Sequence, residues 1–322
     1  MPGSSRVWRW LGIGAGTLLF VFALALAGAI AFGTAEPQRP VPPRQLGLTG
    51  LPPLSRYAAR DGTRLVYRVY PGARGDIAVL IHGTATESSV MNALARTLNA
   101  EGVTVYAPDL RGHGSSGARG DIAYVGQLDD DLADLVGTLR TAQPRGKITL
   151  VGFSGGGAFV MRVAGGPYGK LFDRFIVIDP AIVYPSPIAR PNAGGWATPY
   201  LPRIVGLIVL DRIGLHAFDG LTTIAFAVPP GHPNLTGHYS FRLMMNLNSA
   251  DYFAELERTK KPMALVAGAA DDQFYADRYA TYLKPAKPDL RITLVPGLDH
   301  VDMIMKPAAL AAVRQAYDTL PW

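Results

Sequence analysis

Cysteine is absent from the 322 residues of this chain. Without a thiol, the protein forms no disulfide and offers neither a thiolate metal ligand nor a cysteine nucleophile. A nucleophile, if there is one, must therefore be an oxygen or nitrogen group, and the cellular compartment has to be inferred from targeting signals alone.

Charged side chains are also sparse. They make up 17% of the chain, against 48% hydrophobic residues, and such a composition favours a folded protein over a disordered one. The net charge is +6, but the basic residues do not gather into the stripe that is typical of a nucleic-acid-binding surface. We therefore expect no nucleic-acid partner.

The N-terminal part contains one long apolar run. Residues Leu11 to Gly33 carry no charge, and Arg6 and Arg9 precede them. The run is long enough to cross hydrocarbon as a helix, and the basic flank directs the following domain away from the cytoplasm. Residues 1–35 are thus predicted to be a membrane anchor with the folded domain outside the cytoplasm. The alternative is a cleaved signal peptide and a secreted protein, because residues 33–35 are small.

The next segments differ in composition. Residues 36–54 hold six prolines, which predicts a stiff, extended tether. The folded domain is expected at 55–322, where short apolar runs alternate with helical patterns. Strands are expected at 64–70, 77–81, 103–107, 147–151, 175–178, 262–267 and 291–295, and helices at 90–100, 128–141, from 155, 274–283 and 301–317. This alternation predicts an α/β fold, a mostly parallel sheet with helices on both faces.

Regular patterning lapses between about residues 180 and 250, where prolines and glycines interrupt apolar stretches. The lapse lies between two expected sheet strands, 175–178 and 262–267. We therefore interpret it as a lid inserted into the α/β domain. No internal repeat is visible.

The strongest chemical signal is the pentapeptide Gly152-Phe153-Ser154-Gly155-Gly156. It follows the expected strand 147–151 directly and opens a helical segment, which is the context that the G-x-S-x-G motif requires. A sharp turn there holds the serine hydroxyl clear of the sheet, and the helix N-terminus favours developing negative charge. Ser154 is the predicted nucleophile.

A second signal is His82-Gly83-Thr84, at the end of the expected strand 77–81. In folds with this motif, the loop after that strand gives one backbone amide to the oxyanion and the residue after the nucleophile gives the other. The predicted oxyanion donors are therefore Thr84 and Gly155. His82 itself is interpreted as a structural residue that holds the loop.

The base must be one of the remaining histidines. His300 lies in Pro296-Gly297-Leu298-Asp299-His300, between the last expected strand and the last helix, where the order nucleophile, acid, histidine places it. His113 is better explained by packing in a tight turn. The other three fall within the expected lid: His216, His232 and His238.

The orienting acid has three candidates. Asp271 follows the expected strand 262–267 and is preferred, Asp272 is its neighbour, and Asp179 follows the strand 175–178. Each could instead be a helix cap or a turn former. With Ser154 and His300, the acid would complete a catalytic triad, which forms an acyl-enzyme and then hydrolyses it.

Several motifs together resemble a known family. These are the His82-Gly83 turn, D-L-R-G-H-G-S-S at 109–116, the G-F-S-G-G elbow, G-A-A-D ending at Asp271 and G-L-D-H ending at His300. The chain is similar to α/β hydrolases of the lysophospholipase, monoacylglycerol lipase and serine-aminopeptidase-like group over about 57–317, except in the lid. The resemblance implies hydrolysis of carboxylic esters, often of acyl lipids, without a metal or an organic cofactor. It also implies Ser154, Asp271 and His300 as the triad. Prolyl aminopeptidases of this group typically have tryptophan where Gly155 stands, so peptidase activity is not expected.

The function predicted from the sequence is a membrane-anchored serine esterase or lipase acting on a small-molecule or lipid ester. An acyltransferase that uses the same acyl-enzyme is one alternative, and a catalytically silent binding module is another. Apolar lid residues could line an acyl pocket or could simply pack with one another: Trp196, Tyr200, Phe218, Phe226, Phe241, Met244 and Met245.

Overall fold

The computed structural model describes residues 4–33, 48–183, 186–191, 195–229 and 234–322, and within 4–33 the side chains of 17, 18 and 20–33. Most of the predicted tether, residues 36–47, lies outside the described residues, as do His232 and the side chains of Arg6 and Arg9.

A sheet of eight strands forms the centre of the folded domain, in the order β1-β2-β4-β3-β5-β6-β10-β11. Its strands are β1 (Ser55–Ala58), β2 (Arg64–Tyr70), β3 (Ile77–Ile81), β4 (Thr104–Pro108), β5 (Ile148–Phe153), β6 (Arg174–Ile178), β10 (Met263–Gly268) and β11 (Arg291–Val295). β2 runs antiparallel to β1 and β4, and the pairs from β4 to β11 are parallel. The carboxyl ends of the parallel strands therefore meet at one edge, where ligands bind in such sheets.

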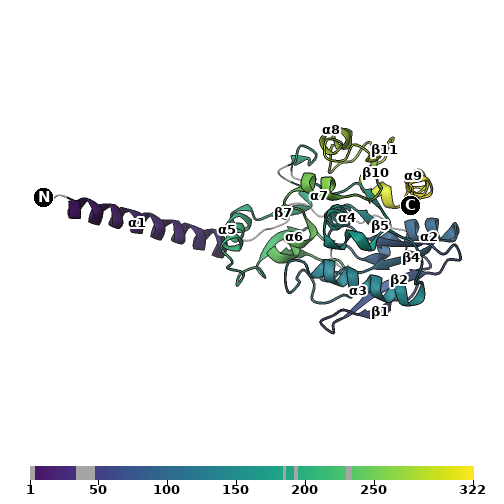
Figure 1. Ribbon diagram of the computed structural model, residues 1–322, viewed down its shortest axis with the longest axis horizontal. Helices are drawn as coiled ribbons and strands as arrows, with labels where there is room; N and C mark the ends of the chain where they lie inside the picture. The colour runs from purple at the N-terminus through teal and green to yellow at the C-terminus, as the bar shows by residue number, and fades with distance from the viewer. Residues whose placement is uncertain (1–3, 34–47, 184–185, 192–194, 230–233) are drawn as a thin grey trace.

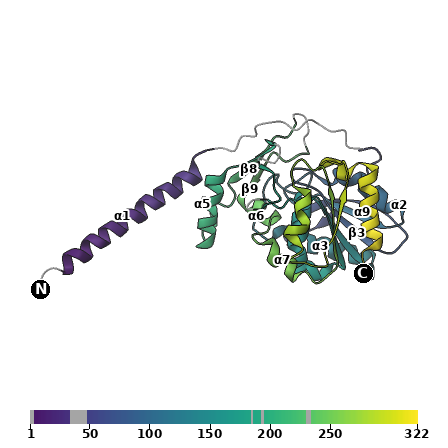
Figure 2. The same ribbon diagram turned by 90° about the horizontal axis from the view of Figure 1, so that it is seen from above.

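Helices cover both faces of this sheet (Figure 2). They are α2 (Asn92–Ala100), α3 (Gln127–Ala142), α4 (Gly155–Gly165), α7 (Tyr252–Arg258), α8 (Tyr279–Leu283) and α9 (Pro307–Thr319), with short 3-10 turns η1 (Ser88–Met91), η2 (Pro167–Leu171), η4 (Ala276–Arg278) and η5 (Val301–Ile304). The predicted α/β fold is confirmed.

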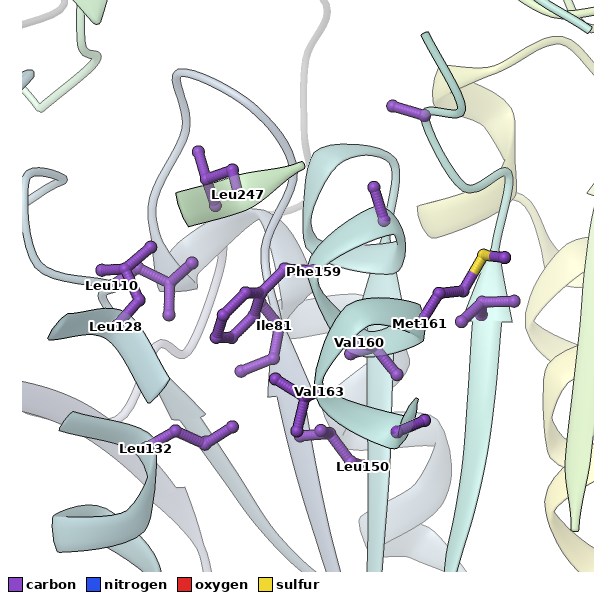
Figure 3. Packing of buried hydrophobic residues seen from close by; sticks show 14 of the residues in the cluster. Ile81, Leu110, Leu128, Leu132, Leu150, Phe159, Val160, Met161, Val163 and Leu247 are labelled. Carbon is purple, nitrogen blue, oxygen red and sulfur yellow. The ribbon is translucent and has the colours of Figure 1, made fainter. Parts of the chain in front are cut away.

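The alternation of side chains along each buried strand builds two cores. On β3, Ile77, Val79 and Ile81 belong to the core beneath α3 and α4, whereas Ala78 and Leu80 belong to the core beneath α2 and α9. Figure 3 shows the first of these around α4, where Phe159 and Val160 pack toward the sheet. Burial on both faces is the reason that β3 to β6 read as continuous apolar runs.

The predicted insertion contains more regular structure than its sequence suggests. Between β6 and β10 lie β7 (Ala197–Pro199), α5 (Leu201–Arg212), β8 (Thr222–Phe226), β9 (His238–Ser240) and α6 (Phe241–Leu247). The three strands form an antiparallel sheet of their own. We call the described residues between 180 and 250 the inserted segment. Its action as a lid stays a prediction.

The N-terminal helix α1 (Ser4–Ala31) projects from the folded domain and reaches it at α5 (Figure 1). Arg203 of α5 donates hydrogen bonds to the carbonyls of Ile30 at 2.8 Å and Gly33 at 2.9 Å, which satisfies acceptors at the end of α1. A helix is thus present where the apolar run predicts one. Within the part of the chain that the structure describes, however, no helix is both long enough and apolar enough to cross a membrane. The predicted transmembrane span at 11–33 is therefore not supported.

Two of the differences from the predicted elements concern the last helix and the first strand. The helix expected at 301–317 is divided into η5 and α9, because Pro307 cannot continue a helix from the residues before it and instead starts a new one. β1 was not expected as a strand; its four residues pair with β2 at the edge of the sheet, with only Tyr57 buried.

Candidate active site

Ser154 lies in a strained turn between β5 and α4. Its backbone angles are φ 53° and ψ −120°, a conformation that a residue other than glycine rarely adopts and that neighbouring structure must hold in place. The Ser154 amide donates to the carbonyl of Ile178 at 2.9 Å, and the Ser154 carbonyl accepts from the amides of Ala158 and Ala181, each at 3.0 Å. The turn is thus fixed by β6 on one side and by α4 on the other.

The glycines of the pentapeptide are required by close backbone approach. A Cβ on Gly152 would lie 2.3 Å from the carbonyl oxygen of Gly156, and a Cβ on Gly156 would lie 2.3 Å from that of His82. Both distances are shorter than any side chain tolerates. Glycine at these positions lets α4 start directly against the ends of β3 and β5.

The structure brings the predicted nucleophile, base and preferred acid together. The hydroxyl of Ser154 lies 2.9 Å from Nε2 of His300, and Nδ1 of His300 lies 2.8 Å from Oδ2 of Asp271. All three residues are buried, and the rings of Phe153 and Phe274 pack against the imidazole. Since a carboxylate only accepts, Nδ1 carries a proton and Nε2 is free to accept the serine proton.

Asp271 is held as an ionised partner for His300. Burial by itself raises the pKa of this carboxyl, but the hydrogen bond to His300 and its charge lower it, and so do the amides of Gln273 and Phe274, which donate to Oδ1 at 2.7 and 2.8 Å. The net result is a pKa below the usual value. A carboxylate with these partners fixes both the tautomer and the orientation of the imidazole.

The two other acid candidates occupy different environments. Asp272 is exposed. Asp179 is fully buried, has a φ of 40°, and accepts from the amide of Gly268 at 3.0 Å through Oδ1, while its Oδ2 has no hydrogen-bond partner among the described residues. Burial and the nearby carboxylate of Asp271 raise the pKa of Asp179 well above its usual value. Asp179 therefore retains its proton more readily than an exposed aspartate does, and it takes no part in the hydrogen bonds of the triad.

The predicted oxyanion donors are neighbours. A Cβ on Gly155 would lie 3.3 Å from the amide nitrogen of Thr84 and 2.2 Å from its Oγ1, so the two backbones approach closely. Gly155 is the first residue of α4, and its amide consequently has no acceptor within the helix. Two amides that face a serine hydroxyl at a helix N-terminus would stabilise a tetrahedral oxyanion, and this role of Thr84 and Gly155 stays a prediction.

His82 and His113 hold loops, as the sequence suggested. Nε2 of His82 accepts from the amide of Leu110 at 3.0 Å, and its Nδ1 faces the carbonyl of Gly83 at 2.9 Å. Nδ1 of His113 faces the carbonyl of Arg111, and its Nε2 lies 2.6 Å from the hydroxyl of Tyr239 in the inserted segment. Sequence reasoning missed Tyr239, because a lone tyrosine in an irregular stretch gives no signal of its partner.

The apolar residues suggested for an acyl pocket differ in how far they are buried. Phe226, Phe241 and Met244 are buried in the core, with Trp196 stacked on Phe226 at 5.2 Å, whereas Phe218 is half exposed. Two surface hollows, along α9 and beside Arg96, contain no triad residue. The acyl pocket stays a prediction.

Among the residues that the structure describes, two clusters have the residue types that bind metals. One is the triad itself with Asp179, but both ring nitrogens of His300 already have partners, which leaves no lone pair for a metal. The other is Asp211, His216 and Asp219 at the end of α5, where Nδ1 of His216 lies 3.0 Å from Oδ2 of Asp219.

Known proteins similar to this chain indicate its family. The family described as serine aminopeptidase, S33, matches residues 73–303. A monoacylglycerol lipase from Mycolicibacterium smegmatis is 32% identical over 130 residues, which are 39% of this chain and 46% of the relative. The match thus spans about half the length of that relative. A 2-(acetamidomethylene)succinate hydrolase from Mesorhizobium japonicum is 26% identical over 80% of this chain and 94% of its own length.

The fold also matches a solved structure. The crystal structure of a monoacylglycerol lipase from Paleococcus ferrophilus superposes with a TM-score of 0.59 at 23% identity, covering 79% of this chain and 97% of that one. The family match includes the serine elbow, the oxyanion loop and the loops of Asp271 and His300. The chain therefore belongs to the serine aminopeptidase S33 family of α/β hydrolases.

Proposed function

We propose that the protein is a serine hydrolase that cleaves carboxylic esters through an acyl-enzyme on Ser154, and that its substrates are lipid-derived. The observation that carries the proposal is the hydrogen-bonded triad: the Ser154 hydroxyl lies 2.9 Å from Nε2 of His300, and Nδ1 of His300 lies 2.8 Å from Asp271. A silent binding module would not need all three groups in hydrogen-bond contact.

The reaction would follow from this arrangement. Nε2 of His300 takes the proton as the Ser154 oxygen attacks the ester carbonyl, and the amides of Thr84 and Gly155 stabilise the resulting oxyanion. The imidazolium, paired with Asp271, returns the proton to the departing alcohol. Water then attacks the acyl-enzyme by the same route and releases the carboxylic acid.

Two observations support an ester of lipid type. Two of the similar proteins are named monoacylglycerol lipases, and the inserted segment beside the site is rich in apolar residues. The succinate-derivative hydrolase among the relatives makes small polar acids the competing substrate class. We also propose that the inserted segment acts as a lid, supported by its contact with the oxyanion loop at Tyr239.

The test profiles the purified protein against p-nitrophenyl esters of graded chain length, a monoacylglycerol, a lysophospholipid and a small amide acid. We expect labelling by a fluorophosphonate, hydrolysis of esters, and higher kcat/KM for long acyl chains than for acetyl. Labelling without hydrolysis, but with ester formation when an alcohol is added, would assign an acyltransferase instead. Absence of both labelling and hydrolysis would overturn the proposal.

The location is a separate proposal. We propose that the N-terminal segment keeps the domain at the outer side of a membrane, as the basic flank at Arg6 and Arg9 predicts. The exposed apolar side chains of Leu18, Phe20 and Phe22 on α1 support contact with an apolar phase. Protease added to intact cells should then cleave the domain. In a separate experiment without protease, the full-length protein should stay with the membrane after an alkaline wash. A soluble form that begins at Glu36 would show signal cleavage.

A further inference from the structure

The oxyanion loop is held by the inserted segment at Ala85, the residue after Thr84. The amide of Ala85 donates to the hydroxyl of Tyr239 at 2.6 Å, and the Ala85 carbonyl accepts from the amide of Thr236 at 2.8 Å. Ala85 has a φ of 63°, a left-handed conformation that a residue with a Cβ keeps only where its surroundings impose it. Both backbone polar groups of this strained residue are therefore bound by a part of the chain more than 100 residues away.

The direction of each proton around Tyr239 follows from its partners. Nδ1 of His113 faces the carbonyl of Arg111 at 3.3 Å, and since a carbonyl only accepts, Nδ1 carries the proton. Nε2 of His113 is then an acceptor, and the hydroxyl of Tyr239 donates a hydrogen bond to it at 2.6 Å. This leaves the tyrosine oxygen with lone pairs for the amide of Ala85.

His113 stays neutral, so this arrangement persists across ordinary pH. Burial first, and then the nearby ring of His82, lower the pKa of His113 to about 3. Burial also raises the pKa of Tyr239, which keeps its hydroxyl protonated. Neither group therefore changes charge at the near-neutral pH at which His300 would accept the proton of Ser154.

We propose that Tyr239 is a positioning residue for the oxyanion hole: its hydroxyl, oriented by His113, holds the Ala85 amide and thereby fixes the neighbouring Thr84 amide toward Ser154. This rests on the proposed serine-hydrolase function. Without the hydroxyl, the buried amide of Ala85 loses its acceptor, and the left-handed turn is free to relax and to rotate the Thr84 amide out of line.

The hydroxyl can be separated from the packing of the ring. The Tyr239 ring is 2% exposed and packs edge to face on Phe226, with ring centroids 4.7 Å apart, so Tyr239→Phe keeps this contact and removes only the oxygen. Tyr57→Phe is the matched control, because Tyr57 is another buried tyrosine whose hydroxyl donates one hydrogen bond, to the carbonyl of Asp131 at 3.3 Å on the β1 side of the sheet.

The experiment compares kcat, KM and inhibition by an alkyl trifluoromethyl ketone, whose hemiketal oxyanion occupies the same hole. Loss of an oxyanion donor lowers kcat by about 10²- to 10³-fold, and since Tyr239→Phe displaces a donor without deleting it, we expect kcat to fall about 10- to 100-fold. KM should stay within about twofold, because substrate binding in the ground state is unchanged. Inhibition by the ketone should weaken in parallel with kcat, and Tyr57→Phe should change neither.

A second variant tests the orientation of the Tyr239 hydroxyl, and unfolding measurements test the fold. His113→Gln leaves Tyr239 in place but replaces its acceptor, and we expect a smaller loss of kcat with KM again unchanged; thermal unfolding of all three variants reports on the fold. Equal kcat and equal ketone inhibition in Tyr239→Phe, Tyr57→Phe and wild type would overturn the inference. A wild type that is not labelled by fluorophosphonate would instead overturn the proposed function itself, so the two failures are distinguishable.

Discussion

In the loops at the carboxyl edge of the sheet, each residue of the triad follows closely on a parallel strand: Ser154 follows β5, Asp271 follows β10 and His300 follows β11. The inserted segment has no such support. Its strands form a separate sheet, and it reaches the oxyanion loop through the Tyr239 hydroxyl and the Thr236 amide, which lie about 150 residues from Ala85 in the chain. The first region holds its residues by local geometry, whereas the second depends on contacts between distant parts of the chain.

Those distant contacts also stabilise the α/β core. Asn246 of α6 is fully buried, and its Oδ1 accepts from the amides of Gly126 at 2.9 Å and Leu128 at 3.0 Å, at the start of α3. Its Nδ2 donates to Asp129 at 2.8 Å. Because Gly126 has no side chain to cap α3, the inserted segment supplies the cap. A movement of the whole segment would uncap this helix.

The largest effect is expected at the strand-end region. Ser154→Ala should lower kcat for ester hydrolysis by about 10⁶-fold, because no other group can form the acyl-enzyme. Ser154→Gly should be equally inactive but more stable than Ser154→Ala by about 1 kcal/mol, since glycine relieves the strain of a positive φ. Kinetics with p-nitrophenyl esters and denaturant unfolding measure the two effects, and wild-type turnover in either variant would remove Ser154 as nucleophile.

The second-largest effect is expected at Asp271, the acid of the triad. Asp271→Asn should lower kcat by about 10⁴-fold, because the amide can no longer fix the required tautomer of His300 or stabilise its charged form. Asp272→Asn is the neighbouring control, and it should leave kcat unchanged since that side chain is exposed. Small and equal losses in both variants would transfer the role to Asp179.

The inserted segment should show its largest effect on stability. Asn246→Ala leaves the amides at the start of α3 without an acceptor and should lower the free energy of unfolding by about 2 kcal/mol. The control is Asn248→Ala, which removes only one bond from a half-buried side chain to the carbonyl of Met244. Denaturant unfolding compares the two; equal losses would mean that the inserted segment does not brace the core.

The smallest effect concerns Asp179, the buried acid at the end of β6. The pKa of Asp179 is raised above 3.8 in the folded state by burial and by Asp271, with Asp272 contributing. Its contribution to stability is thus fully present below about pH 3.8 and declines as the pH rises through the raised value, because the folded state retains a proton that the unfolded state releases.

Asp179→Asn cannot ionise, so it should lack this decline. Its stability relative to wild type should increase with pH above about 3.8 and then level off. Asp271 and Tyr279, which also face Asp179, are present in both proteins, and their own titrations largely cancel in the difference. Unfolding of both proteins in urea across a pH series measures this difference in the free energy of unfolding. A difference that stays constant with pH would show that Asp179 titrates normally.

Much of the sheet was predictable because its strands are short, apolar and followed by turn residues. The run at 77–81 matches β3, and 291–295 matches β11, residue for residue. The edge strand β1 was missed, since only one of its side chains is buried and no periodic pattern results. The short strands of the inserted segment were missed for a related reason. β7 and β9 have three residues each, which are too few to show an alternation of apolar and polar side chains.

The sequence by itself determined the elbow at Ser154, because only glycine fits at positions 152 and 156 when a helix starts against a strand end. It also determined that His300 follows the last strand. Tertiary structure alone decided which acid reaches His300, since Asp179 and Asp271 are both buried residues that follow parallel strands and differ in their hydrogen-bond partners. It alone joined Tyr239 to Ala85 and Asn246 to α3, because contacts between segments so far apart in the chain leave no local pattern.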